Sequence, residues 1–161
     1  MKKFVKMIHQ EPHHGKEQFA NWLSEISSTN YYEMQNGDID LSNMEIKDKD
    51  FHYLHLRNID FSNSDLTQTN FMSAKLTNCN FTNCNLTETV FQTTRIENCC
   101  FDNVNLTNAQ FHCVKMYDCN LSRAKNFKTL YQCHICFYIG EHFIGNYDEN
   151  FEFHLYQQYN K

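Results

Sequence analysis

The chain has 161 residues, of which 41% are hydrophobic and 20% are charged, and it carries a net charge of −5. This length suits a single domain, and the composition is that of a folded protein. One proline and four glycines exclude collagen-like chains and flexible linkers. No apolar run approaches the roughly 18 residues of a membrane-spanning helix, so no membrane contact is expected.

The first residues and the charge distribution indicate where the protein acts. The start, Met1–Ile8, is basic like a signal peptide, but Lys6 and His9 interrupt its apolar stretch. We therefore expect a cytoplasmic protein. Residues 1–37 hold four basic and four acidic residues, 38–125 hold eight and eleven, and 126–161 hold two and four. Because no segment is strongly basic, we do not expect direct binding of nucleic acid.

The N-terminal segment, residues 1–37, contains one predicted helix over residues 14–27. Pro12 stands just ahead of it, as is typical of a helix start. Its apolar residues recur with helical spacing and are Phe19, Trp22, Leu23 and Ile26. The polar side has no surplus of Lys or Arg, which disfavours a membrane-surface helix. We expect this helix to cap the domain that follows.

Residues 38–125 are organised by a five-residue repeat. Every fifth residue from Leu41 to Leu121 is large and apolar, seventeen in a row, and Asn126 ends the run. Such a spacing fits neither the helical period nor that of a strand. It does fit a chain that turns a corner every five residues and closes one square coil in about 20 residues. Stacked coils of this kind share one core, as in solenoid proteins.

A second column lies two residues before each large one, and most of its members are small. Four cysteines occupy it, in alternation with Ala, Thr, Ser and Val: Cys79, Cys84, Cys99 and Cys119. Free cysteine is a good small apolar filler, so we interpret them as core thiols in a reducing compartment. The other three positions are mostly Asn, Asp and Thr, which predicts outward-facing hydrogen-bond ladders between coils.

These units resemble the repeats of the pentapeptide-repeat family, in which a small residue precedes Asp or Asn, Leu or Phe, and two polar residues. Matching units are Cys79-Asn80-Phe81-Thr82-Asn83, Cys84-Asn85-Leu86-Thr87-Glu88 and Val104-Asn105-Leu106-Thr107-Asn108. The resemblance covers roughly residues 39–125. It implies an all-β solenoid, a right-handed quadrilateral β-helix of about four coils, in which both columns point inward. At the spacing of β-strands the rod would be about 20 Å long.

Two features of the columns refine this expectation. Phenylalanine recurs at every tenth position from Phe51 to Phe111. We therefore expect phenylalanine rings to stack on two opposite faces and aliphatic side chains to stack on the other two. Lys49 falls in the column of small residues, where a buried charge is costly. The first coil is therefore expected to be irregular.

Residues 126–161 lose the repeat and are rich in aromatic residues. Such a segment is too apolar to be disordered, so we expect it to form a C-terminal cap. Aromatic residues are also enriched in interface cores, and Phe143, Tyr147 and Phe151 are candidates for a homodimer surface. Capping alone and capping with dimerisation both remain open at this point.

The same segment contains one motif with metal-ligand character. Cys133 and Cys136 form a CxxC pair, and His142 follows, which are residue types that bind zinc. A second close pair is missing, so we interpret these residues first as parts of the aromatic cap. Zinc binding and a redox pair are the weaker alternatives, the second because no βαβ context surrounds the pair.

The function expected from the sequence is non-enzymatic. There is no glycine-rich phosphate loop, GxSxG or HExxH motif, so we expect neither catalysis nor a cofactor. The main hypothesis is a rigid scaffold that binds a protein partner of unknown identity. The resemblance implies an alternative, because family members of the quinolone-resistance type mimic DNA and protect DNA gyrase. Mimicry needs an acidic face, for which Asp60, Asp65 and Asp102 are the candidates.

Overall fold

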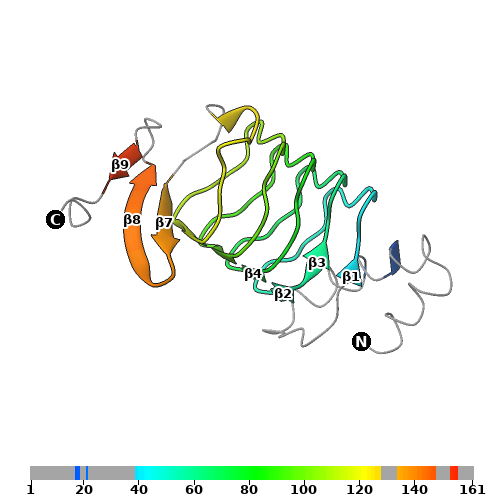
Figure 1. Ribbon diagram of the computed structural model, residues 1–161. Coiled ribbons are helices and arrows are strands. Elements are labelled where there is room, and N and C mark those ends of the chain that lie inside the picture. The colour runs from blue at the N-terminus through cyan, green and yellow to red at the C-terminus, as the bar shows by residue number, and fades with distance from the viewer. Residues whose placement is uncertain (1–16, 19–20, 22–38, 128–133, 148–152, 156–161) are drawn as a thin grey trace.

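The computed structural model describes residues 17–18, 21, 39–127, 134–147 and 153–155. Glu17, Gln18 and Asn21 are helical, and the remainder of the predicted N-terminal helix lies outside the described residues. From residue 39 onward the chain winds into stacked coils around one axis (Figure 1). No helix in the described ranges is long and apolar enough to cross a bilayer.

Each corner of the coil is a residue in the left-handed backbone conformation. Sixteen consecutive corners, one every five residues from Asn43 to Asp118, have φ between 51° and 60°. This conformation is costly for most residues, and asparagine tolerates it better than others. Asparagine accordingly occupies nine of the seventeen non-glycine positions with positive φ. The corners include Asn43, Asp48 and Tyr53, so the backbone of the first coil is regular and the expected irregularity at Lys49 is wrong.

The strands stack in parallel on successive coils. β1 (Ile39–Asp40) pairs with β3 (Ile59–Asp60). A longer sheet runs in the order β2 (His55–Arg57), β4 (Lys75–Thr77), β5 (Arg95–Glu97), β6 (Val114–Tyr117), β7 (Ile135–Ile139), β8 (His142–Tyr147) and β9 (Phe153–Leu155). Pairing from β2 to β7 is parallel, and β8 and β9 are antiparallel additions. On the other faces, adjacent coils meet at single bridges such as Asp65↔Asn85.

The parallel stack extends beyond the last five-residue unit. Within the repeat, paired residues are twenty positions apart, as in Leu76↔Ile96. Val114 instead pairs with Ile135, an offset of twenty-one. Strand β7 therefore adds a fifth layer to this face, although residues 126–161 carry no repeat. The chain is a quadrilateral β-helix, as expected, with this additional layer at its C-terminal end (Figure 1).

The core contains two columns of phenylalanine rings on opposite faces, as the sequence predicts. One column is Phe51, Phe71, Phe91 and Phe111, with centroids 4.8–5.4 Å apart, and the other is Phe61, Phe81 and Phe101, at 5.0–5.1 Å. The two columns also touch across the core, edge to face, at 6.0–6.3 Å. Each central ring thus has aromatic neighbours above, below and opposite, a favourable arrangement of ring quadrupoles.

The column of small residues buries hydroxyl groups without leaving them unsatisfied. Ser64, Thr69, Thr89 and Thr94 are buried, and each hydroxyl donates to a backbone carbonyl of the preceding coil over 2.7–2.8 Å. Buried polar groups are tolerated when they are bonded in this way. These hydrogen bonds explain why serine and threonine alternate with alanine and cysteine in the inward column.

Candidate interaction surfaces

Besides the exposed corner residue, each unit has two outward side chains, one on each side of the large buried residue. On the face formed by β2, β4, β5 and β6, the first of these positions places His55, Lys75, Arg95 and Lys115 in register on four successive layers. Arg57 occupies the second position on β2. We call these five residues the basic face. Neighbouring layers lie about 4.8 Å apart, the spacing of paired strands.

The basic face holds a large share of the positive charge of the β-helix. Residues 39–127 contain eight Lys and Arg residues, and four of them belong to this face. Glu97 is the acidic residue among the outward side chains of β2, β4, β5 and β6, so the formal charge there is +3 with His55 neutral. The chain as a whole carries −5. Folding therefore gathers positive charge on one face, and the net charge of the chain gives no sign of this.

Contacts hold the centre of this face in place. Arg95 pairs with Glu97, its Nη1 donates to the Tyr117 hydroxyl over 2.8 Å, and its guanidinium carbon lies 3.9 Å from the centre of the Tyr117 ring. Lys75 Nζ lies 3.3 Å from Glu97 Oε2. Burial raises the pKa of Glu97, but its contacts with Arg95 and Lys75 outweigh this effect and hold the pKa below the usual value. Glu97 thus stays ionised and keeps both cations in position.

An acidic face adjoins the basic face. Its outward side chains flank Leu41, Phe61, Phe81 and Phe101 and include the carboxylates of Asp40, Asp60 and Asp102. Asp60 Oδ1 accepts from the Ser62 backbone at 2.9 Å and from Asn80 Nδ2 at 3.1 Å. Asp102 pairs with Arg123 at 3.2 Å. These carboxylates therefore take part in the ladders and ion pairs of the coil itself.

The third candidate acid, Asp65, lies on the face that follows the acidic face. Its Oδ1 accepts from the Thr67 hydroxyl at 2.6 Å, and its Oδ2 lies 3.2 Å from Lys47 Nζ. Burial raises the pKa of Asp65, but the hydrogen bonds from Thr67 and Lys47 outweigh it and lower the pKa overall. The structure brings Asp60 and Asp102 onto one face and leaves Asp65 on another.

Two of the three candidate dimer residues, Phe143 and Tyr147, lie in strand β8. Phe143 packs edge-on against Tyr138 at 5.5 Å, and Tyr138 stacks on Tyr117 at 4.4 Å. The backbone of Tyr147 pairs with Ile135 on one side and Phe153 on the other. Phe151 lies outside the described residues. A dimer through these residues stays a prediction.

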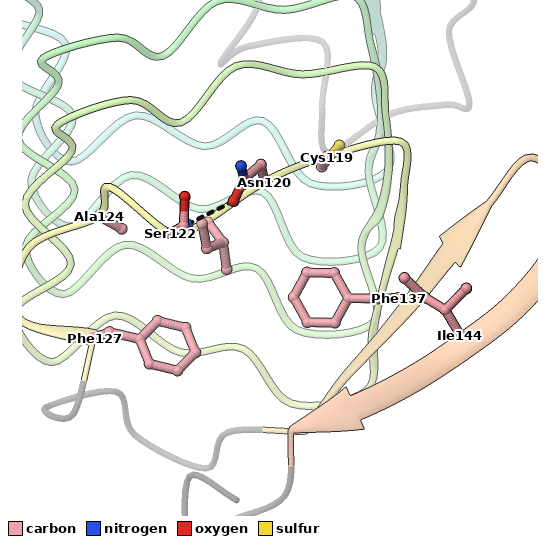
Figure 2. Close-up of a pocket in the computed structure, with 8 residues that line it drawn as sticks. Cys119, Asn120, Ser122, Ala124, Phe127, Phe137 and Ile144 are labelled. Atoms are coloured by element: carbon pink, nitrogen blue, oxygen red, sulfur yellow. Dashed lines mark hydrogen bonds between the residues drawn. The ribbon is translucent and has the colours of Figure 1, made fainter. Parts of the chain in front are cut away.

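Between the last coil and strands β7 and β8 lies a hollow of about 360 Å³. It is lined by Cys119, Asn120, Leu121, Ser122, Ala124, Phe127, Phe137 and Ile144. Figure 2 shows the rings of Phe127 and Phe137 directed into it, and the Ser122 backbone donating to the Asn120 side chain. The lining is mostly apolar, so the hollow belongs to the packing between the last coil and the added strands.

The candidate metal ligands are only partly described. Cys133 lies outside the described residues, Cys136 is half-buried opposite Lys115, and His142 begins β8. Burial raises the pKa of the Cys136 thiol, and Lys115 opposes that shift. Within the described part of the chain, no three His, Cys, Asp or Glu residues are grouped so as to hold a metal ion. Zinc binding through Cys133 therefore stays a prediction.

The family model described as pentapeptide repeats matches residues 55–92 and 91–125, with 8 copies. These coils belong to the pentapeptide-repeat family. The family match and the quadrilateral coil agree with the large and small inward columns read from the sequence. No curated protein matches the chain.

Several solved pentapeptide-repeat proteins are similar in structure. HetL of Nostoc sp. strain PCC 7120, described as involved in heterocyst differentiation regulation, is 11% identical with a TM-score of 0.42, and the match covers 77% of this chain and 59% of HetL. Rfr23 of Cyanothece 51142 is 25% identical with a TM-score of 0.27, covering 47% and 55%. A thylakoid-lumen protein of Arabidopsis thaliana is 28% identical with a TM-score of 0.25, covering 50% and 63%. The chain thus spans less than two-thirds of each of these structures.

The sequence prediction missed the basic face of these repeats. The charge balance of a continuous segment mixes all four faces of the coil and hides this face. The signal is nevertheless present in the sequence, because Lys75, Arg95 and Lys115 are spaced by twenty residues. A count at the period of one full coil would have found the basic face.

Proposed function

We propose that the protein is a rigid, non-enzymatic scaffold that binds a protein partner through an outer face of its β-helix. The observation that carries this proposal is the separation of positive and negative charge onto two adjoining faces of a β-helix with a packed core. A flat surface of fixed charge suits recognition of another macromolecule, because charge complementarity fixes orientation and excludes wrong partners. Membership of the repeats in a family of stacked coils is consistent with such a role.

The arrangement of reactive groups also supports a non-enzymatic role. The Cys84 thiol is buried, and burial raises its pKa to about 12, so it stays protonated and unreactive. Asp60 and Asp65 accept hydrogen bonds from Asn80 and Asn85 of the next coil, so their carboxylate oxygens help to hold neighbouring coils together. Groups engaged in this way stabilise the rod and are poorly available for acid–base chemistry.

The alternative function, protection of DNA gyrase by DNA mimicry, would use the acidic face. Asp60 and Asp102 favour it, because they share that face with Asp40. Two features favour the scaffold instead. Asp65 lies on a different face, and Asp102 is neutralised by Arg123. A DNA mimic must present an extended row of negative charge to a phosphate-binding surface, and this face is short and interrupted.

Photo-crosslinking from defined faces tests the scaffold proposal. A photoreactive phenylalanine analogue would replace one half-exposed outward residue at a time. The four positions are Thr77 on the face that carries the basic residues, Thr82 on the acidic face, Thr87 on the third face and Gln92 on the fourth. We expect a discrete adduct with one protein, identified by mass spectrometry, from one face or two adjoining faces. Adducts of equal yield from all four faces, or none from any face, would contradict the proposal.

A further inference from the structure

We propose that the basic face is a docking site for an acidic α-helix of a protein partner. This inference rests on the proposed scaffold function and specifies its face and the chemistry of its partner. The face is a row of cations on neighbouring parallel strands, with Lys75 and Arg95 at its centre and Lys115 at one end. Its ligand must therefore present a matching row of carboxylates.

The basic face is pre-organised for such a ligand. Arg95 is fixed by the Tyr117 ring and hydroxyl and by Glu97, so docking costs little of its side-chain entropy. Lys115 is exposed, and so is Arg57, and neither forms an ion pair with another residue in the part of the chain that the structure describes. Two cations are thus available at the ends of the row, and one oriented guanidinium lies between them.

The spacing of the row favours a helix over other acidic ligands. Successive layers are about 4.8 Å apart, so the three steps from His55 to Lys115 span about 14 Å. A helix repeats every 5.4 Å, so carboxylates on one stripe, one per turn, span about 16 Å over three turns. The flexible side chains of lysine and arginine take up a difference of about 2 Å. A helix laid along the rod axis can therefore place one carboxylate near each side chain of this row, three of which are the cations Lys75, Arg95 and Lys115.

The charge of the whole molecule disfavours nucleic acid as the occupant. The chain carries −5, and the acidic face adjoins the basic one. A long polyanion passes beyond the basic face and meets this negative charge, which acts over a Debye length of about 8–10 Å. A single acidic helix touches only the local positive charge. The basic face therefore suits a short acidic segment of a protein.

Binding of a designed peptide tests this inference on the full-length protein. The probe is a fluorescent alanine-based helix of about 20 residues with glutamates at i, i+4, i+7 and i+11, which form one stripe. The control peptide has the same composition with its glutamates spread around the helix. We expect saturable binding of the striped probe at about 20 mM salt, at least about tenfold tighter than the control, and weakening as salt rises.

Matched variants separate the basic face from net charge. The triple variant Arg57→Gln, Lys75→Gln and Lys115→Gln removes three charges from the basic face. The control variant Lys47→Gln, Arg123→Gln and Lys125→Gln removes three charges from other positions. We expect the first to weaken probe binding by about tenfold or more and the second by less than about twofold. Circular dichroism of both variants verifies that the coils remain folded.

Several results would overturn the inference. They are absent binding of the striped probe, equal binding of both peptides, equal losses in both triple variants, or tighter binding of a single-stranded oligonucleotide of equal charge. The scaffold proposal is tested separately. A specific crosslink from the acidic face, combined with no probe binding, would leave the scaffold standing and reject the basic face as its docking site.

Discussion

Asn105 donates its side-chain amide to the side-chain oxygen of Asn85 over 3.1 Å, although the two residues are twenty positions apart in the chain. Asn85 in turn donates to Asp65, and Asn126 donates to Asn105. One side-chain ladder thus links four layers on the outside of the rod. Because Asn85 and Asn105 each donate and accept, a shift in register would break every step.

Phe91 occupies the centre of the aromatic core, and its truncation should destabilise the whole rod. Its ring lies 5.3 Å from Phe71 and 4.8 Å from Phe111, and it is fully buried. We expect Phe91→Ala to lower the free energy of unfolding by about 3–5 kcal/mol and Phe91→Leu by less than half as much. Urea titration followed by circular dichroism measures both. A loss in Phe91→Leu as large as that in Phe91→Ala would contradict this expectation, because it would show that an aliphatic side chain of similar volume restores nothing.

The corner conformation predicts a stabilising substitution. Thr93 has a β-branched side chain at φ 56°, and asparagine occupies the equivalent conformation at nine other positions. Thr93→Asn should raise the free energy of unfolding by about 0.5–1 kcal/mol, because asparagine tolerates the left-handed region. The reverse change at Asn78, Asn78→Thr, should lower it by a similar amount. Thermal unfolding measures both, and a loss of stability in Thr93→Asn would refute the explanation.

Asp65 should make stability depend on pH in the acidic range. Its pKa is lowered in the folded state, so it contributes stability above its unfolded value of 3.8 and loses that contribution as pH falls through the folded pKa. Asp65→Asn should therefore flatten the decline of stability from about pH 5 downward. Thr67→Val, which removes one donor to Asp65, should flatten it partly. Urea midpoints measured across this range would contradict the account if both variants kept the wild-type slope.

The cysteines should fall into two classes of reactivity. Cys84 and Cys99 are buried, and burial raises the pKa of each thiol. Cys100 and Cys113 are exposed. Iodoacetamide should therefore modify Cys100 and Cys113 in the folded protein, and Cys84 and Cys99 only after urea is added. Peptide mass spectrometry follows each site. Modification of Cys84 at the rate of Cys100 without urea would contradict its burial.

Much of the fold follows from the sequence because the repeat acts directly on packing. The run from Leu41 to Leu121 places one large apolar residue in every unit. A coil that turns a corner every five residues buries all of them in one core. The alternating phenylalanines likewise predict the two ring columns. The layer added by β7 could not be predicted in this way, because its offset of twenty-one breaks the period.

The candidate surfaces follow less well from the sequence than the core does. Inward positions can be recognised in the sequence because they are apolar. Outward positions accept many residue types, so which outward residues are neighbours becomes evident only when the coils are stacked. Lys75 and Arg95 are separated by twenty residues yet lie on neighbouring strands. Glu97 forms ion pairs with both Lys75 and Arg95, and only the side-chain geometry shows this role. The assignment of Asp60 and Asp65 to adjoining faces, by contrast, follows from the sequence, because the two residues are one five-residue unit apart.

The stacking of residues twenty positions apart is the central claim, since it assembles the core, the ladders and the basic face. Nuclear Overhauser contacts between side-chain methyl groups test it most directly. The structure pairs Leu76 with Ile96 and Ile96 with Met116 on successive layers. We therefore predict strong cross-peaks for both pairs in a methyl-labelled sample. Absence of these cross-peaks, with contacts at another spacing such as fifteen or twenty-five residues, would contradict the account.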